Sequence, residues 1–258
     1  MKGGFSLVEL SIVLVILGLL TGGILAGQSL IRASELRSVS VDFKRYSAAA
    51  YTFRDKYFGW PGDFKDATKF WGSAGGTGAD ATCFSAQSQA SVATCNGDGN
   101  GDSSTAAGVN SSERFMTWKH LANAGLIEGS YTGKTTGASG TYSILVGTNV
   151  PGSKVGAGSF FDMYAAAFNA GYAFTETIFP SQEITLYGDP ANSYGALLPE
   201  EAWNIDTKLD DGSPVYGVVY SNKKTATVAP NCTSSDANDA TYDLTVQGKN
   251  CLSHFRYR

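Results

Sequence analysis

The first acidic residue of the chain, Glu9, stands inside a long apolar run that begins at Phe5. The 22 residues from Leu10 to Ile31 carry no charge, and as an α-helix they would span roughly 33 Å, close to the ~30 Å hydrocarbon thickness of a bilayer. An ionised carboxylate inside such a segment costs on the order of 2.5–3.5 kcal/mol by insertion scales. We therefore expect Glu9 to need a positively charged partner.

A second group of oxygen-bearing side chains stands in a glycine-rich loop and consists of Asn96, Asp98, Asn100 and Asp102. Calcium prefers clustered carboxylate and amide oxygens, and this alternating spacing matches the first half of an EF-hand-type loop. The glutamate expected at the twelfth position is missing, since counting from Asn96 gives Ala107 and counting from Asp98 gives Val109. Glu113 could close the site only through a different fold. The loop is predicted either to bind calcium or to be a solvated, turn-rich segment.

The other candidates for chemistry are weaker. A second acidic patch, which could hold a metal or simply end a helix and turn, consists of Asp206, Asp210 and Asp211. The two histidines, His120 and His254, lie in no metal-binding or nucleophile motif. Residues 147–154 almost spell a phosphate loop, but an extra serine separates glycine from lysine and no apolar helix follows, which indicates a turn. We therefore predict that the chain is not an enzyme.

The four cysteines are an even number, which favours an oxidising compartment. Four cysteines permit three pairings. The pairs that close the shortest loops are Cys83 with Cys95 and Cys232 with Cys251. Each bond would contribute ~3 kcal/mol in the chain-entropy model. A zinc site is disfavoured, because the sequence contains no C-x-x-C pair.

Glu9 belongs to one continuous helix, which we predict from about Phe5 to Phe58. Its first half, residues 5–31, is apolar all round, and its second half, residues 32–58, has one apolar stripe between charged residues. The stripe consists of Leu36, Val39, Phe43, Tyr46, Ala50, Phe53 and Tyr57. We expect it to pack on a soluble head. Gly59-Trp60-Pro61-Gly62 should end the helix, because proline cannot continue it and glycine supplies the unusual dihedral angles of the exit.

Four glycines interrupt the apolar half of this helix: Gly18, Gly22, Gly23 and Gly27. Each costs ~1 kcal/mol of helix propensity, but their spacing also permits close approach of a second helix. They are either tolerated glycines of a membrane helix or a patch that packs against, or unwinds beside, neighbouring subunits.

The remainder, residues 59–258, is long enough for one soluble head and is predicted to be α+β, with an antiparallel sheet and long loops. Helices are expected at 63–71, after the capping box Asn110-Ser-Ser-Glu113 and from Pro199 to Asp206, with a long loop at 72–112. The predicted strands are 141–146, 159–168, 173–178, 184–187, 215–220 and 242–246. The net charge of −4 and the lack of a basic footprint argue against nucleic acid as a partner.

The chain begins with a short basic leader, Met1-Lys2-Gly3-Gly4, and the stretch Gly3-Gly4-Phe5-Ser6-Leu7-Val8-Glu9-Leu10 places Phe directly after the last glycine of the leader and Glu four residues later. This pattern resembles the processing site of type IV prepilins and type II secretion pseudopilins. The resemblance implies that residues 1–4 are a leader, that a prepilin peptidase cleaves between Gly4 and Phe5, and that the new Phe5 amine is N-methylated. It also implies a pilin-like fold, in which a C-terminal disulfide loop such as Cys232–Cys251 is common.

The function implied by this resemblance is that of a structural subunit of a type IV pilus-like filament. Such a subunit is held in the inner membrane by a single helix, and an assembly platform then polymerises it with further copies and minor pilins into a periplasmic or cell-surface filament. Glu9 could pair with its own Phe5 amine, at the i, i+4 spacing of helical pairs, or with the amine of an incoming subunit, which is the partner that the resemblance implies and that we favour. The alternatives are a pseudopilin of a type II secretion system, or a minor tip pilin whose head is an adhesion or ligand-binding module.

Overall fold

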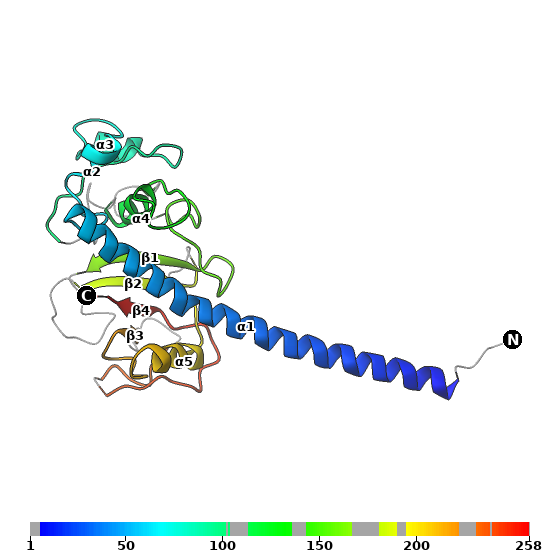
Figure 1. Ribbon diagram of the computed structural model, residues 1–258. Coiled ribbons are helices and arrows are strands. Elements are labelled where there is room, and N and C mark those ends of the chain that lie inside the picture. Colours follow the sequence, from blue (N-terminus) through cyan, green and yellow to red (C-terminus); the bar gives the residue numbers. More distant parts are fainter. Residues whose placement is uncertain are drawn as a thin grey trace.

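The computed structural model describes residues 6–101, 103, 113–135, 143–166, 181–189, 195–221, 231–237 and 239–257. One long helix, α1 (Leu7–Tyr57), runs from a free N-terminal end into a head (Figure 1). The described part of this head contains four shorter helices and an antiparallel sheet of four strands. The architecture confirms the predicted α+β class with a long N-terminal helix.

The 51 residues of α1 divide into a free half and a packed half, as the sequence predicts. The apolar stripe of the second half is buried at Val39, Phe43, Tyr46, Ala50 and Phe53, together with Ala49. The two ends of the stripe, Leu36 and Tyr57, are partly buried against the same core. Because such a side chain contributes ~1.5–3 kcal/mol when fully buried, this stripe holds the helix on the head.

The exit of α1 differs from the prediction in one respect. Phe58, and not a glycine, takes the left-handed conformation at the end of the helix, with φ 58°, and its N–H donates to the carbonyl of Arg54 at 2.8 Å. Gly59 is required for a different reason: a Cβ atom at this position would lie 2.8 Å from the ring of Phe64. Glycine supplies an unusual dihedral angle further along the predicted stop, at Gly62 with φ 90°, while Phe58 supplies the one directly after the helix.

The shorter helices of the head are α2 (Ala67–Trp71), α3 (Ala81–Ala86), α4 (Glu113–Asn123) and α5 (Pro199–Leu209). Helix α2 is shorter than the predicted 63–71, and α3 lies inside the segment predicted to be a loop. The Asp80 carboxylate caps α3 by accepting a hydrogen bond from the Cys83 N–H at 2.8 Å. Helix α5 begins at Pro199, as predicted. The predicted start of α4, at the capping box Asn110-Ser-Ser-Glu113, lies outside the described residues except for Glu113, which is already helical.

The strands are β1 (Phe160–Ala166), β2 (Ser181–Tyr187), β3 (Val219–Ser221) and β4 (Ser253–Arg256), in the spatial order β1-β2-β4-β3. Strands β1 and β2 correspond to predicted strands, and β3 covers only the end of 215–220. Strand β4 was not predicted. The described parts of 141–146 and 242–246 form isolated bridges rather than strands, so these two predictions are wrong. The predicted strand 173–178 lies outside the described residues.

Helix α1 crosses one face of this sheet (Figure 1). Phe43 stacks on Phe255 with ring centres 5.1 Å apart, and Tyr46 meets the edge of Phe161 at 5.5 Å. The alternate residues of the strands are polar yet buried, and the pairing register aligns Asp162, Thr185, His254 and Tyr220 in one row. Arg114 of α4 forms an ion pair with Asp162 in this row.

Two disulfides connect the cysteine pairs that the loop lengths favour. Cys83 and Cys95, with Cα atoms 5.9 Å apart, join α3 to the loop that follows it. Cys232 and Cys251, with Cα atoms 4.9 Å apart, close a loop that ends just before β4. All four sulfur-bearing side chains are fully buried, so the disulfides hold two loop regions onto the core.

Candidate functional site

Among the described residues, most of the exposed large apolar side chains lie in the apolar half of α1. The helix is long and apolar enough to cross a membrane, and none of its most apolar stretch is buried against the head. Every residue from Leu7 to Ile31 is exposed except Gly27, which is partly covered. A Cβ atom at any of the four glycines of this half would meet nothing within 4 Å. This surface is therefore open to lipid or to another helix.

Glu9 lies in the first turn of α1, where it takes part in a capping box. The Ser6 N–H donates to Glu9 Oε2 at 2.8 Å, and Ser6 Oγ accepts from the Val8 and Glu9 N–H groups at 3.2 and 3.5 Å. A carboxylate at this position is also favoured by the positive end of the helix dipole. Glu9 thus helps to start the helix, and it remains exposed for a further partner. Gly4 and Phe5 lie outside the described residues.

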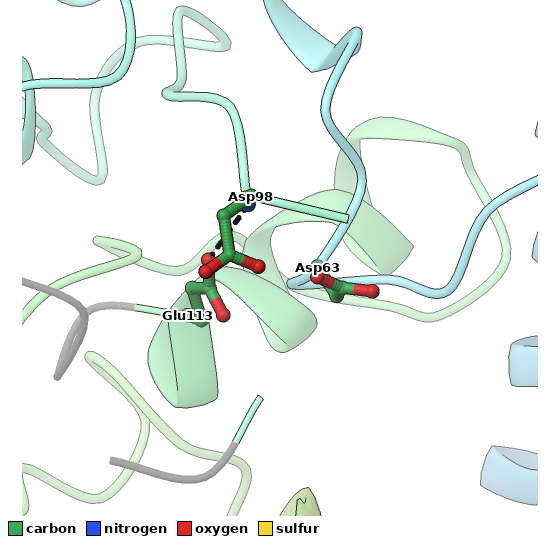
Figure 2. A group of neighbouring side chains, drawn as sticks. All are labelled: Asp63, Asp98 and Glu113. Atoms are coloured by element: carbon green, nitrogen blue, oxygen red, sulfur yellow. Dashed lines mark hydrogen bonds between the residues drawn. The ribbon is translucent and has the colours of Figure 1, made fainter. Parts of the chain in front are cut away.

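A second site is formed by three carboxylates that come from distant parts of the sequence. Asp63 follows the exit of α1, Asp98 lies in the glycine-rich loop, and Glu113 is the first residue of α4 (Figure 2). One oxygen from each lies within 4.8 Å of the others. Asp63 and Glu113 are buried, whereas Asp98 is exposed. This arrangement offers oxygen ligands of the kind that calcium prefers.

Backbone hydrogen bonds hold the loop around Asp63. Its Oδ1 accepts from the N–H groups of Gly99 and Asn100 at 2.7 and 3.0 Å, and its Oδ2 accepts from Gly101 at 2.9 Å. Glu113 Oε1 accepts from the Asp98 N–H at 2.9 Å. Gly97 is required because a Cβ atom there would lie 2.4 Å from the backbone of Asp63. The loop is thus wrapped closely on the turn that follows α1.

Electrostatics in this cluster favour a proton or a cation. Burial raises the pKa of Asp63 to about 6, with Asp98 adding to the effect, although the hydrogen bonds from Gly101 and Gly99 oppose it. The raised pKa means that the ionised form of Asp63 is unfavourable, chiefly because the group is buried and secondarily because Asp98 is near. A bound cation would offset both effects.

The predicted calcium ligands are only partly brought together. The Asn96 Oδ1 accepts from the Thr68 N–H at 2.8 Å and so serves the start of α2. Asn100 lies beside Asp98, to whose Oδ2 its Nδ2 donates at 2.9 Å. Asp102 lies outside the described residues. Sequence reasoning missed Asp63 and regarded Glu113 as available only through a different fold, and the fold does bring it to Asp98.

The second acidic patch also forms, but its carboxylates anchor the chain. Asp206, Asp210 and Asp211 have oxygens within 4.8 Å of one another. Buried Asp206 accepts from the Tyr242 hydroxyl at 2.8 Å and from the Gly212 N–H at 3.0 Å. Asp210 accepts from the Val218 N–H. These bonds join the end of α5 to the turn before β3 and to the C-terminal disulfide loop.

Asp206 predicts a dependence of stability on pH. Burial raises its pKa to about 7, so its contribution to stability is complete below its unfolded pKa near 4 and is lost as the pH rises through 7. We expect the free energy of unfolding, measured in a calcium chelator, to fall from pH 4 to pH 7. The Asp206→Asn variant should remove part of this fall, on the order of 1.4 kcal/mol per unit of pKa difference. Parallel curves for the variant and the wild type would contradict this role.

Both histidines are buried, and burial lowers the pKa of each to about 3. His120 Nδ1 accepts from the Gly62 N–H at 3.0 Å, while its Nε2 lies 3.3 Å from the carbonyl of Cys95. His254 Nδ1 lies 3.0 Å from Thr185 Oγ1 in the polar row of the sheet. Both rings are therefore neutral near pH 7, and their contacts join segments of the fold.

Comparisons of the chain with protein-family models, with curated proteins and with solved structures find no match. A function for this chain is consequently inferred from its own residues, chiefly the exposed half of α1 and the carboxylate cluster at its far end.

Proposed function

We propose that this protein is a structural subunit of a type IV pilus-like filament, which is stored in the inner membrane and polymerised through the exposed half of α1. The observation that carries the proposal is that one continuous helix is apolar and uncovered over residues 7–31, while its second half forms part of the core of the head. The motif around Gly4 and Phe5 supports cleavage by a prepilin peptidase, with methylation of Phe5.

The physical reason for a dual role is the composition of this helix. An exposed apolar segment of this size is stable in lipid or against other apolar helices, but not in water. Before assembly it would cross the bilayer, and after assembly the same surface would pack against the helices of neighbouring copies. The open glycines permit such close packing. Transfer between the two states would require an inner-membrane assembly platform.

Two related roles remain as alternatives. The subunit could belong to a type II secretion system as a pseudopilin, which neighbouring genes for a secretin and secreted hydrolases would favour. It could instead be a minor pilin at a filament tip, where its head serves adhesion or ligand binding. The long segment between α2 and α4 favours the second alternative, because loops of this length are usually functional or held by specific bonds.

Immunogold electron microscopy of filaments sheared from the source organism tests the proposal. We expect antibodies against the head to label filaments along their length. Label confined to one end would support the tip alternative. Filaments of normal number and composition in a strain that lacks the gene would contradict a role as a structural subunit.

We further propose that the head binds calcium through Asp63, Asp98 and Glu113. The convergence of three carboxylates from three segments supports this site. The cation would join the exit of α1, the glycine-rich loop and the start of α4, and would thereby stabilise the region at the end of α1. Asn100, beside Asp98, could supply an additional amide oxygen.

Chelation should therefore lower the melting temperature of the full-length chain in detergent at pH 7.5. At a free calcium concentration 100 times Kd the stabilisation is ~2.7 kcal/mol, or roughly 5–10 °C for a domain of this size. The shift should fade below pH 6, because protons compete for Asp63. The Glu113→Gln variant, which keeps the acceptor for the Asp98 N–H, should lose most of the shift, whereas Asp55→Asn on the exposed side of α1 should retain it. An unchanged melting temperature over a wide range of calcium would refute the site.

A further inference from the structure

Arg32 is the first charged residue after the apolar run, and its side chain joins α1 to the head. Its guanidinium donates to both carboxylate oxygens of Glu201, each at 2.6 Å. It also donates to the carbonyl of Val155 at 2.6 Å and to the Glu35 carboxylate at 2.9 Å. These acceptors belong to α5, to the turn before β1 and to α1 itself. One side chain therefore holds three segments at the point where the helix leaves the head.

The geometry of this contact depends on arginine. A planar guanidinium can bond to both oxygens of a carboxylate at once, which lysine cannot do. Glu201 is itself held, because its Oε2 accepts from the Leu198 N–H at 3.0 Å at the start of α5. The side chains of Arg32 and Glu201 are 26% and 12% exposed, so water screens the pair less than it would on an open surface.

The helix has different surroundings on the two sides of Arg32. Toward the N-terminus, the glycines at 18, 22, 23 and 27 have open space around them and weaken the helix. In the same stretch, the Thr21 hydroxyl donates back to the carbonyls of Leu17 and Gly18 at 2.9 and 3.1 Å, a contact that often bends helices. Toward the C-terminus, α1 is buried in the core from Val39 onward. Arg32 thus stands at the start of the packed half, seven residues before Val39, the first fully buried residue of α1.

We infer that Arg32 is a positioning residue, which fixes the direction in which the apolar half of α1 leaves the head and confines bending to residues 18–27. This inference rests on the proposed function. The 25 residues from Leu7 to Ile31 form a lever of roughly 38 Å, so a change of about 10° at Arg32 moves its end by about 7 Å. That displacement is close to the 8–10 Å separation of packed helices. Regular packing of subunits therefore needs this direction to be held.

Distances between spin labels in the full-length chain, reconstituted in lipid nanodiscs, test the inference. All four cysteines are disulfide-bonded, so the labels are attached to unnatural amino acids at Leu30 and Ser234, which are exposed and lie outside the stretch 18–27. We expect a narrow distance distribution for the wild type and at least a twofold broadening for Arg32→Gln. Arg32→Lys, which keeps the charge but cannot bond to both oxygens of Glu201 at once, should give a distribution of intermediate width. Arg37→Gln, at an exposed arginine on the same helix, is the matched control and should match the wild type.

A merely stabilising ion pair would change the melting temperature of the head without broadening these distances, and that result would overturn the inference. Filament formation gives the second readout. Arg32→Gln should reduce sheared filaments at least tenfold at equal membrane levels, and normal filaments would overturn the inference as well. If the wild-type chain forms no filaments at all, the proposed function fails, while the label distances still show whether Arg32 sets the direction of the helix.

Discussion

Replacing Glu9 with glutamine should reduce filament formation at least tenfold while membrane insertion and cleavage before Phe5 continue. Cleavage creates a positively charged amine at Phe5, and a buried carboxylate without a positive partner is strongly unfavourable. Pairing of Glu9 with the amine of a neighbouring subunit would therefore fix the axial register between adjacent helices. The measurement is the amount of sheared filament, by electron microscopy and immunoblot, from cells that carry only the variant.

The structure shows that the Glu9→Gln substitution tests the charge alone. Glu9 Oε2 accepts from the Ser6 N–H, and the amide oxygen of glutamine can accept the same bond, so the start of α1 is preserved and only the charge is lost. Ser11→Ala is the matched control, because it changes a polar residue in the same turn, whose hydroxyl donates only to the Val8 carbonyl at 2.9 Å. Normal filaments from the Glu9→Gln strain would show that apolar packing suffices and that the charge has another purpose.

The second large effect is expected at the leader. Replacing Gly4 with leucine should leave the full-length precursor in the inner membrane and abolish assembly, because the bulky side chain would stand directly before the proposed cut and uncut chains would lack the free Phe5 amine. Intact mass spectrometry of the membrane fraction should then find chains that begin at Met1 and no chains that begin at Phe5.

Gly3→Ala, one residue earlier, is the control and should be processed as the wild type is. Filaments that contain uncut Gly4→Leu chains would contradict the requirement for cleavage. Wild-type filament subunits that still begin at Met1 would contradict the interpretation of residues 1–4 as a leader.

The long helix was predictable because its two halves follow simple physical patterns. An uncharged run that, as a helix, matches the hydrocarbon thickness of a bilayer indicates the free half. Apolar residues at alternating spacings of three and four indicate the packed half. The disulfide pairing was predictable because closing a short loop costs less conformational entropy than closing a long one. The reason for glycine at position 59 was not predictable from the sequence. It is a tertiary contact, because the ring of Phe64 approaches the backbone so closely that a side chain at Gly59 would not fit.

The sheet shows why strand prediction was weaker. Strand β4 contains His254 and Arg256, which are polar but lie in a covered row where His254 approaches Thr185 and Arg256 lies 5.1 Å from the ring of Tyr220. The residues from His254 to Tyr257 alternate between polar and apolar types, but the run is too short to distinguish a strand from a loop by its pattern alone. Tyr242 gives the opposite error. The apolar residues around it predict a strand, but in the structure its buried hydroxyl donates to the Asp206 carboxylate and no strand forms there.

The carboxylate cluster could be predicted only in part. Asp98 was chosen because oxygen-bearing residues alternate in its loop. Asp63 gives no such signal, because no oxygen-bearing residues alternate around it, and it reaches the loop only when the turn after α1 folds against it. Glu113 was recognised as a possible ligand whose use depended on the fold. Sites assembled from separate segments depend on tertiary contacts that local patterns do not contain.

Electron cryomicroscopy of filaments sheared from the source organism tests the central claim most directly. We expect the apolar halves of α1, residues 7–31, to form a bundled core, with the heads outside and each Glu9 within bonding distance of the Phe5 amine of an adjacent copy. A filament in which this chain is present but its N-terminal helices are separated from one another, with the heads making the continuous contacts, would contradict assembly through α1.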